Sequence, residues 1–353
     1  MREPCWMLYG ANGYTGVLLA EEAVRRGHKP ILAGRSAEKL RPLAERLRLE
    51  MVTVALDDAD ALDAALREVD LVFNAAGPFS RTSAPLLRAC LATKTSYGDI
   101  TGEISVFEHT LSLDAQAKEA GVALISGLGF DVVPTDCLAR YVADAVPGAT
   151  DLELAIATSG APSAGTAKTM LEILSRGNFF RREGALLPAP EAPVTRRVRF
   201  PDREQVVMAI PWGDLATAYR TTAVPNITTY MAMPGAGSPL MEPVNGFLKW
   251  ATAFPAVQQW GEKAIDRLVK GPSQQDRDTM RSYVWARAAD REGHAKEAWL
   301  DTVEAYRLTA EAGVRAVEKI LETRPVGALT PALAFGADFV LEIESTRRLD
   351  KLA

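Results

Sequence analysis

The sequence predicts an α/β protein with an N-terminal doubly wound parallel sheet and a second, α+β domain. A glycine-rich turn joins a short apolar run to a helical pattern near residue 10. Short apolar strands then alternate with helices up to about residue 147, which is typical of parallel sheets. Longer runs of alternating polarity follow. We therefore predict a first domain at residues 1–147 and a second at 148–309.

The first turn has the residues of a dinucleotide site. It joins a predicted strand at 5–9 to a predicted helix at 17–26, with glycines spaced GxxGxxG. In such a turn, the first glycine permits a tight bend, the second lets the backbone approach a pyrophosphate, and the third lets helix pack on strand. The helix N-terminus then offers N–H groups to the phosphates. The predicted contacts, in a domain of the Rossmann type, are Gly10, Asn12, Gly13, Tyr14, Thr15 and Gly16.

The end of the second predicted strand, 31–33, favours NADP over NAD. NAD-binding units usually carry an acid here for the ribose 2′-OH, but this chain has Gly34, Arg35 and Ser36. A guanidinium binds a 2′-phosphate through charge-assisted bonds. The alternative is a solvated surface arginine, and Ser36 can also cap the next helix.

Two further strand ends extend the predicted coenzyme site. Asp57 follows the third strand, where it can approach the adenine or cap a helix. The fourth strand, 70–74, ends in small residues that leave room for a ligand beyond the carboxyl edge of the sheet. These predicted contacts on the nicotinamide side are Asn74, Ala75, Ala76, Gly77 and Pro78.

Later polar runs supply candidates for handling a proton. Asp99 and Tyr97 end the fifth predicted strand, and Lys168 follows a loop of small residues in the second domain. Each has a structural alternative: Asp99 can cap the helix that begins near Glu103, and Lys168 can be a solvated lysine. Glu103, Asp131 or water are the other possible donors.

The second domain contains predicted strands at 152–157, 194–200, 205–210, 227–233, 282–289 and 298–306, with a proline-rich connection at 185–193. Residues 244–269 carry aromatic residues at helical spacing. This segment is either a packed helix pair or lid, or a surface that touches lipid or an acyl carrier.

Composition excludes several classes of protein. The net charge of −5 argues against a nucleic-acid partner. Three dispersed cysteines and three histidines without a ligand partner at helical spacing predict neither disulfides nor a metal site. We see no signal peptide and no apolar run long enough to cross a bilayer, so we expect a cytoplasmic protein.

The motifs taken together resemble the saccharopine dehydrogenase-like oxidoreductases, in the branch that includes the trans-acting enoyl reductases. The resemblance rests most on the runs 99–103 and 129–136, with 9–16, 32–36, 77–79, 163–175 and 327–335. It implies NADP(H), hydride transfer, and a C-terminal segment, about 310–353, that packs on the first domain.

The resemblance leaves the reaction open between a C=C bond of an enoyl-type or lipid-like acyl substrate and a C=N bond. The alternatives are an NADP-binding scaffold without turnover and a saccharopine-type dehydrogenase of amino-acid adducts. We also expect a homodimer, with peripheral membrane contact possible.

Overall fold

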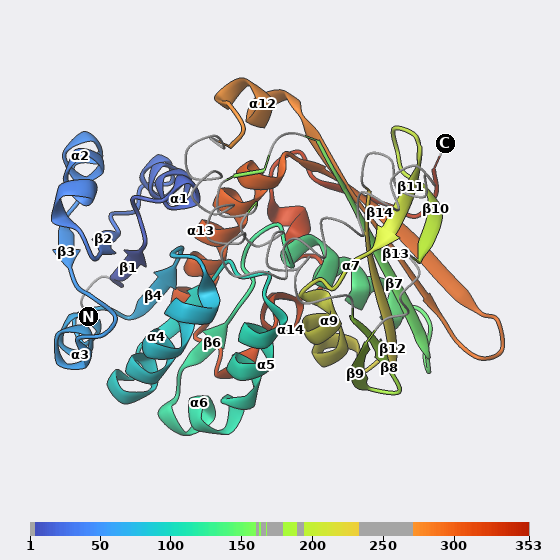
Figure 1. The fold of residues 1–353 in the computed structure, drawn as a ribbon, viewed down its shortest axis with the longest axis horizontal. Helices are drawn as coiled ribbons and strands as arrows, with labels where there is room; N and C mark the ends of the chain where they lie inside the picture. The colour runs from blue at the N-terminus through green and yellow to red at the C-terminus, as the bar shows by residue number, and fades with distance from the viewer. Residues whose placement is uncertain are drawn as a thin grey trace, which may run out of the picture. The chain divides into compact units, whose positions relative to one another are not determined.

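The computed structural model describes residues 4–159, 162–163, 167, 179–188, 194–232 and 271–352. Two compact units are present (Figure 1): Met1–Val133 with Tyr306–Ile343, and Pro134–Ala305 with Glu344–Ala353. The predicted domain boundaries were 147 and 309. Lys168 and the aromatic segment 244–269 lie outside the described residues.

The first unit is built on a parallel sheet whose strand order is β15-β6-β5-β4-β1-β2-β3. From β6 to β3 this order is that of a doubly wound dinucleotide-binding fold, which confirms the predicted fold class. The strands are β1 (Trp6–Tyr9), β2 (Ile31–Gly34), β3 (Met51–Thr53), β4 (Leu71–Asn74), β5 (Ser96–Asp99), β6 (Ala123–Ile125) and β15 (Gly327–Leu329). The helices between them are α1 (Tyr14–Arg25), α2 (Ala37–Leu47), α3 (Ala59–Leu66), α4 (Phe79–Thr93), α5 (Ile104–Ser112) and α6 (Asp114–Ala120).

Helices cover both faces of this sheet. On one face, α3, α4 and α6 pack against alternate strand residues, including Met7, Val72 and Leu124. On the other face, α13 (Ala305–Thr323) lies beside α1. A Cβ added to Gly313 of α13 would lie 2.7 Å from Leu19 of α1 and 3.0 Å from Phe73 of β4. The chain therefore returns to its first unit after forming the second.

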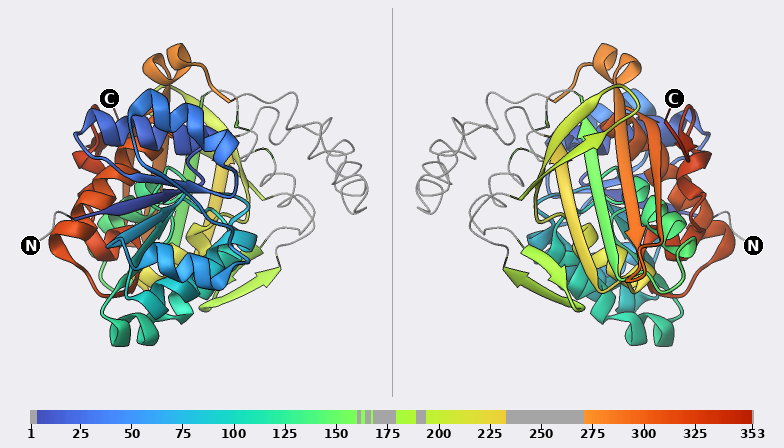
Figure 2. Two further views of the ribbon diagram at one scale, coloured as in Figure 1. Left: turned by 90° about the vertical axis from the view of Figure 1, so that its left-hand side faces the viewer. Right: turned by 90° about the vertical axis from the view of Figure 1, so that its right-hand side faces the viewer.

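The second unit is a mixed sheet in the order β10-β11-β12-β7-β13-β14-β16, with β8 paired to β12 and β9. Only β12 and β7 run parallel among the pairs of this sheet in the described residues. Figure 2 shows its long strands side by side. They are β7 (Asp151–Thr158), β8 (Phe179–Arg182), β9 (Ala185–Pro188), β10 (Thr195–Arg199), β11 (Glu204–Ala209), β12 (Asn226–Ala232), β13 (Arg281–Ala289), β14 (Ala295–Val303) and β16 (Arg347–Leu349).

The remaining described helices are short apart from α7 (Val133–Asp144). They are α9 (Asp214–Thr222), α12 (Gln274–Thr279), α14 (Pro331–Phe335) and the 3-10 helix η1 (Phe339–Glu342). No helix among the described residues has the length and apolarity to cross a membrane.

Two local predictions need correction. Residues 185–188 form β9, paired with β8, instead of part of a loop. The last ten residues belong to the second unit, since β16 pairs with β14 there, whereas 306–343 belong to the first.

Candidate functional site

The glycine turn after β1 is shaped as the sequence predicts. Gly10 has φ +81, which L side chains rarely adopt, and a Cβ there would lie 2.7 Å from the backbone nitrogen of Ala76. A Cβ on Gly16 would clash with the carbonyl oxygen of Gly10 and lie 2.9 Å from the backbone of Ala11. The turn is thus packed against the start of α1, whose N-cap is Gly13.

The first turn of α13 lies against the first turn of α1. The rings of Tyr14 and Tyr306 meet edge to face, with centroids 5.1 Å apart. One turn later, the Oγ1 of Thr309 accepts a hydrogen bond from the backbone N–H of Phe130, 3.0 Å away. Helix α13 therefore contacts the turn after β1 and the loop after β6. Sequence reasoning missed Tyr306 and Thr309, because nothing in their local pattern marks a contact almost 300 residues from the glycine turn.

Polar groups gather at the ends of β2 and β3. The Oδ1 of Asn12 lies over Gly34, 3.4 Å from where its Cβ would be. Arg35 is exposed. Its charge and that of Asp57 both act on Tyr9, whose pKa is raised chiefly by burial, lowered by Arg35 and raised by Asp57. Arg35 and Asp57 therefore both lie near Tyr9 at the edge of the sheet, and Arg35 supplies a positive charge there.

Two predicted helix caps differ from the sequence reading. Ser36 is the N-cap residue of α2, but its side chain makes no capping hydrogen bond. Asp58, and not Asp57, caps α3 by accepting from the N–H of Ala61 at 3.0 Å. The side chains of Ser36 and Asp57 are therefore not used to start these helices.

The end of β4 is ordered by a buried amide. The Oδ1 of Asn74 accepts from the N–H of Ala76 at 3.0 Å, and its Nδ2 donates to Thr82 at 3.1 Å and to the hydroxyl of Tyr97 at 3.2 Å. Ala75 donates its N–H to the carbonyl of Tyr9. Ala75 and Ala76 are half-buried, whereas Gly77 and Pro78 are exposed. The predicted small-residue edge thus exists, with Asn74 as its internal support.

Asp99 lies at the centre of a buried network. Its Oδ2 accepts from the hydroxyls of Tyr97 (2.8 Å) and Ser126 (2.9 Å), and its Oδ1 accepts from the backbone N–H groups of Thr101 (3.0 Å) and Gly127 (2.9 Å). Asp99 and Tyr97 are both fully buried. Burial raises the pKa of Asp99 to about 6, against the lowering effect of these four hydrogen bonds.

This network joins the ends of three neighbouring strands: β4 through Asn74, β5 through Asp99 and β6 through Ser126. The alternative that Asp99 caps the helix near Glu103 is wrong, because its backbone partners are Thr101 and Gly127. In the described residues, the hydrogen bonds of Tyr97 and Asp99 hold the ends of β4, β5 and β6 together. Their predicted catalytic role stays a prediction.

Glu103 is already engaged as a cap. Its two carboxylate oxygens accept from the N–H groups of Phe79 (2.7 Å) and Ser80 (2.9 Å), at the N-terminus of α4. A carboxylate in this position also stabilises the positive end of the helix dipole. Glu103 therefore orders the loop that contains Gly77 and Pro78.

Asp131 is the other predicted proton-handling residue near this edge. It is half-buried, and a Cβ on Gly102 would lie 3.0 Å from its Oδ2. Burial raises its pKa to about 7. Asp131 is thus a carboxyl beside the loop after β5 whose pKa burial raises toward neutrality.

One group of described residues has ligand atoms close enough to hold a metal ion: Asp290, Glu292 and His294, within 4.8 Å of one another. They lie in the turn between β13 and β14. The carboxylate of Asp290 already accepts from the N–H groups of Glu292 and His294 and bonds the His294 ring at 2.8 Å. These bonds are those of a hairpin turn.

The fold and this edge together define a dinucleotide-binding α/β protein with a second mixed-sheet unit. Residues 6–125 match the model of the saccharopine dehydrogenase NADP-binding domain. The first unit thus contains a region that matches this family's domain, and the resemblance predicted from the sequence is confirmed.

Known proteins extend the likeness beyond this domain. A putative trans-acting enoyl reductase of Mycobacterium tuberculosis is 36% identical over 183 residues, which cover 48% of this chain and 44% of the relative. A trans-acting enoyl reductase of Mycobacterium leprae is 38% identical over 138 residues, or 37% of this chain and 33% of the relative. The matched part thus spans less than half the length of these relatives.

A solved structure shows that the fold as a whole is known. The apo saccharopine dehydrogenase (L-Glu forming) of Saccharomyces cerevisiae matches with a TM-score of 0.65 over 96% of each chain, at 12% identity. The likeness therefore covers both the parallel sheet and the second mixed sheet.

Proposed function

We propose that this protein is an NADP(H)-dependent oxidoreductase that reduces the C=C bond of an enoyl-type acyl substrate. The observation that carries the proposal is the family match of residues 6–125, combined with a tightly packed glycine turn that leads into the N-terminus of α1. The names of the trans-acting enoyl reductases support the C=C bond. The bound coenzyme would supply the hydride, and the chain itself would bind, orient and exclude water.

Different residues of the first unit would bind different parts of the coenzyme. The turn from Gly10 to Gly16 and the start of α1 would hold the pyrophosphate. Arg35, exposed at the end of β2 with no carboxylate partner among the described residues, would bind the 2′-phosphate of NADP. The alternative, a solvated surface arginine, predicts that Arg35 has no influence on the choice between NADP and NAD.

The small residues that follow β4 would border the nicotinamide. The side chain of Asn74 holds them in place through its hydrogen bond to the N–H of Ala76. Asp131 is the best-placed proton donor, because it combines partial exposure with a pKa near neutrality. Tyr97 and Asp99 would act through position, since both are enclosed.

A second candidate reaction is reduction of a C=N bond. The observation that favours it is the whole-length match to a saccharopine dehydrogenase. Assays of NADPH oxidation against matched panels of enoyl thioesters and imines separate the two. Turnover of enoyl thioesters alone supports the first proposal, and turnover of imines alone supports the second. Binding of NADPH without turnover of either panel would instead support an NADP-binding scaffold without catalytic activity. A homodimer and a cytoplasmic location remain predictions.

A further inference from the structure

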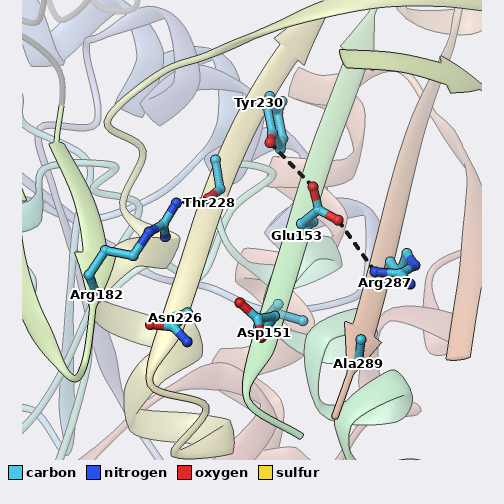
Figure 3. A pocket seen from close by; sticks show the side chains of 9 residues that line it. Asp151, Glu153, Arg182, Asn226, Thr228, Tyr230, Arg287 and Ala289 are labelled. Carbon is cyan, nitrogen blue, oxygen red and sulfur yellow. Dashed lines mark hydrogen bonds and ion pairs between the residues drawn. The ribbon is translucent and has the colours of Figure 1, made fainter. Parts of the chain in front are cut away.

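A cavity of about 320 Å³ lies on the second sheet (Figure 3). Four adjacent strands line it: β8, β12, β7 and β13. Its floor contains two directly paired positions, Asn226 with Asp151 and Thr228 with Glu153. Arg182 of β8 and Arg287 of β13 stand on either side of this floor. The lining residues are Asp151, Leu152, Glu153, Arg182, Asn226, Thr228, Tyr230, Arg287 and Ala289. All belong to the second unit, outside the part that the family model matches.

Arg182 is held in place by neutral partners. Its Nη1 donates to the carbonyls of Arg181 (2.8 Å) and Ile227 (3.2 Å), and its Nη2 donates to the hydroxyl of Thr228 (3.0 Å). The guanidinium also lies over the ring of Phe180, 4.8 Å from its centroid. In the described part of the chain, no carboxylate forms an ion pair with it. The fold therefore fixes a full positive charge at the cavity before any ligand binds, which lowers the entropy lost on binding.

The two acids of the cavity are in different states. Glu153 forms ion pairs with Arg196 and, at 3.7 Å, with Arg287, and it accepts from the hydroxyl of Tyr230 at 3.2 Å. Its charge is thus compensated. Asp151 is exposed and accepts from the hydroxyl of Thr150 at 2.8 Å, with no ion pair among the described residues.

The charges of the cavity determine which chemical groups of a ligand it can bind. The lining residues carry two guanidinium groups, from Arg182 and Arg287, and two carboxylates, from Asp151 and Glu153. Because Glu153 is paired with Arg196 and Arg287, Arg182 is the lining cation that has no ion-pair partner among the described residues. A planar guanidinium recognises carboxylate or phosphate oxygens in pairs. Asp151, as an acceptor, favours a hydroxyl or ammonium donor on the same ligand. The volume lies at the lower end of the range for ligand pockets.

We propose that this cavity binds a small organic anion, with its carboxylate or phosphate on Arg182 and a hydroxyl or ammonium group facing Asp151. The site lies outside the predicted coenzyme residues, all of which are in the first unit. It therefore predicts a ligand of the second unit in addition to NADP(H).

The test is calorimetric titration of the full chain with two matched pairs of probes in a buffer without other oxyanions. The pairs are glycerol 3-phosphate against methyl phosphate, and lactate against propionate. We expect the hydroxylated member of at least one pair to bind more tightly, with a Kd of about 1 mM or lower. Binding in only the phosphate pair or only the carboxylate pair identifies the anion and supports the site.

Variants tie the binding to the cavity. Arg182→Gln should weaken binding at least tenfold, and Asp151→Ala, which removes the acceptor, should remove the difference within the pair. Arg291→Gln is the matched control, because Arg291 is an exposed arginine of the same unit that does not line the cavity. If Arg182→Gln does not fold, Arg287→Gln serves instead and should also weaken binding, since its guanidinium makes, among the described residues, only the 3.7 Å ion pair to Glu153. Absence of binding at about 10 mM of every probe, or an equal loss in Arg291→Gln, would overturn the proposal.

Discussion

Asp99 provides a quantitative test of the buried network at the strand ends. Burial raises its pKa from 3.8 to about 6. Between these values the folded protein keeps the proton while the unfolded chain has lost it, so the free energy of unfolding falls as pH rises. About two pKa units at 1.36 kcal/mol each give a loss of about 3 kcal/mol between pH 4 and pH 7.

Asp99→Asn should abolish this pH dependence. The asparagine Oδ1 can still accept from the N–H groups of Thr101 and Gly127, and its amide can donate to the hydroxyls of Tyr97 and Ser126. The Tyr97 proton then loses its acceptor, at a cost of about 1 kcal/mol. The variant should therefore be less stable than the wild type by about 1 kcal/mol at pH 4 and more stable by about 2 kcal/mol at pH 7.

Native-state hydrogen exchange in urea, read on amides of β4 and β5, measures this difference for the first unit alone, since the two units need not unfold together. Subtracting the variant from the wild type cancels the titration of other groups. Asp57→Asn, which changes an exposed carboxylate outside the buried network, is the control. A difference for Asp99→Asn that is also flat from pH 4 to pH 7 would refute the reasoning, because Asp99 would then be ionised throughout.

Three further predictions concern the coenzyme and the proton. Arg35→Asp should weaken NADPH binding at least tenfold and leave NADH nearly unchanged in fluorescence titrations; equal effects on both coenzymes would make Arg35 a bystander. Tyr306→Ala should weaken NADPH binding about threefold to tenfold through loss of the contact with Tyr14, whereas Tyr306→Phe should retain it; an unchanged alanine variant would contradict that role. If Asp131 donates the proton, kcat of the wild type should fall as pH rises through about 7, and Asp131→Asn should lower kcat about a hundredfold and remove that limb; a retained limb would exclude Asp131.

The first sheet was predictable because local signals and topology agree. Each strand of β1 to β4 is a short apolar run followed by small or polar residues, and parallel strands place all such ends at one edge. The turn from Gly10 to Gly16 needs its glycines for steric reasons that act within a few residues, together with Ala76. Local sequence therefore carried the information for this part of the site.

The roles of the polar residues were harder to predict, because they depend on partners distant in sequence. From the sequence, Asp99 and Glu103 are both candidate proton donors. In the structure, Asp99 is enclosed by groups from β5, β6 and the loops after them, and Glu103 caps a helix that begins 24 residues earlier. The strands β8 and β9 escaped prediction for a similar reason: Phe179–Arg182 and Ala185–Pro188 are stabilised by pairing, and they lack a clear alternation of their own.

The first unit also shows why a matched domain and a folded domain need different boundaries. The family match ends at residue 125, but α13 covers Leu19 and Phe73, both of which are fully buried. Removing α13 would expose two large apolar side chains, at a cost of about 1.5–3 kcal/mol each, and would break the ion pair between Arg26 and Glu318. It would also remove Tyr306 from Tyr14, at the turn where the coenzyme phosphates are expected. A fragment of residues 6–125 should therefore fold poorly, and the NADP-binding unit must be understood as one that both halves of the chain complete.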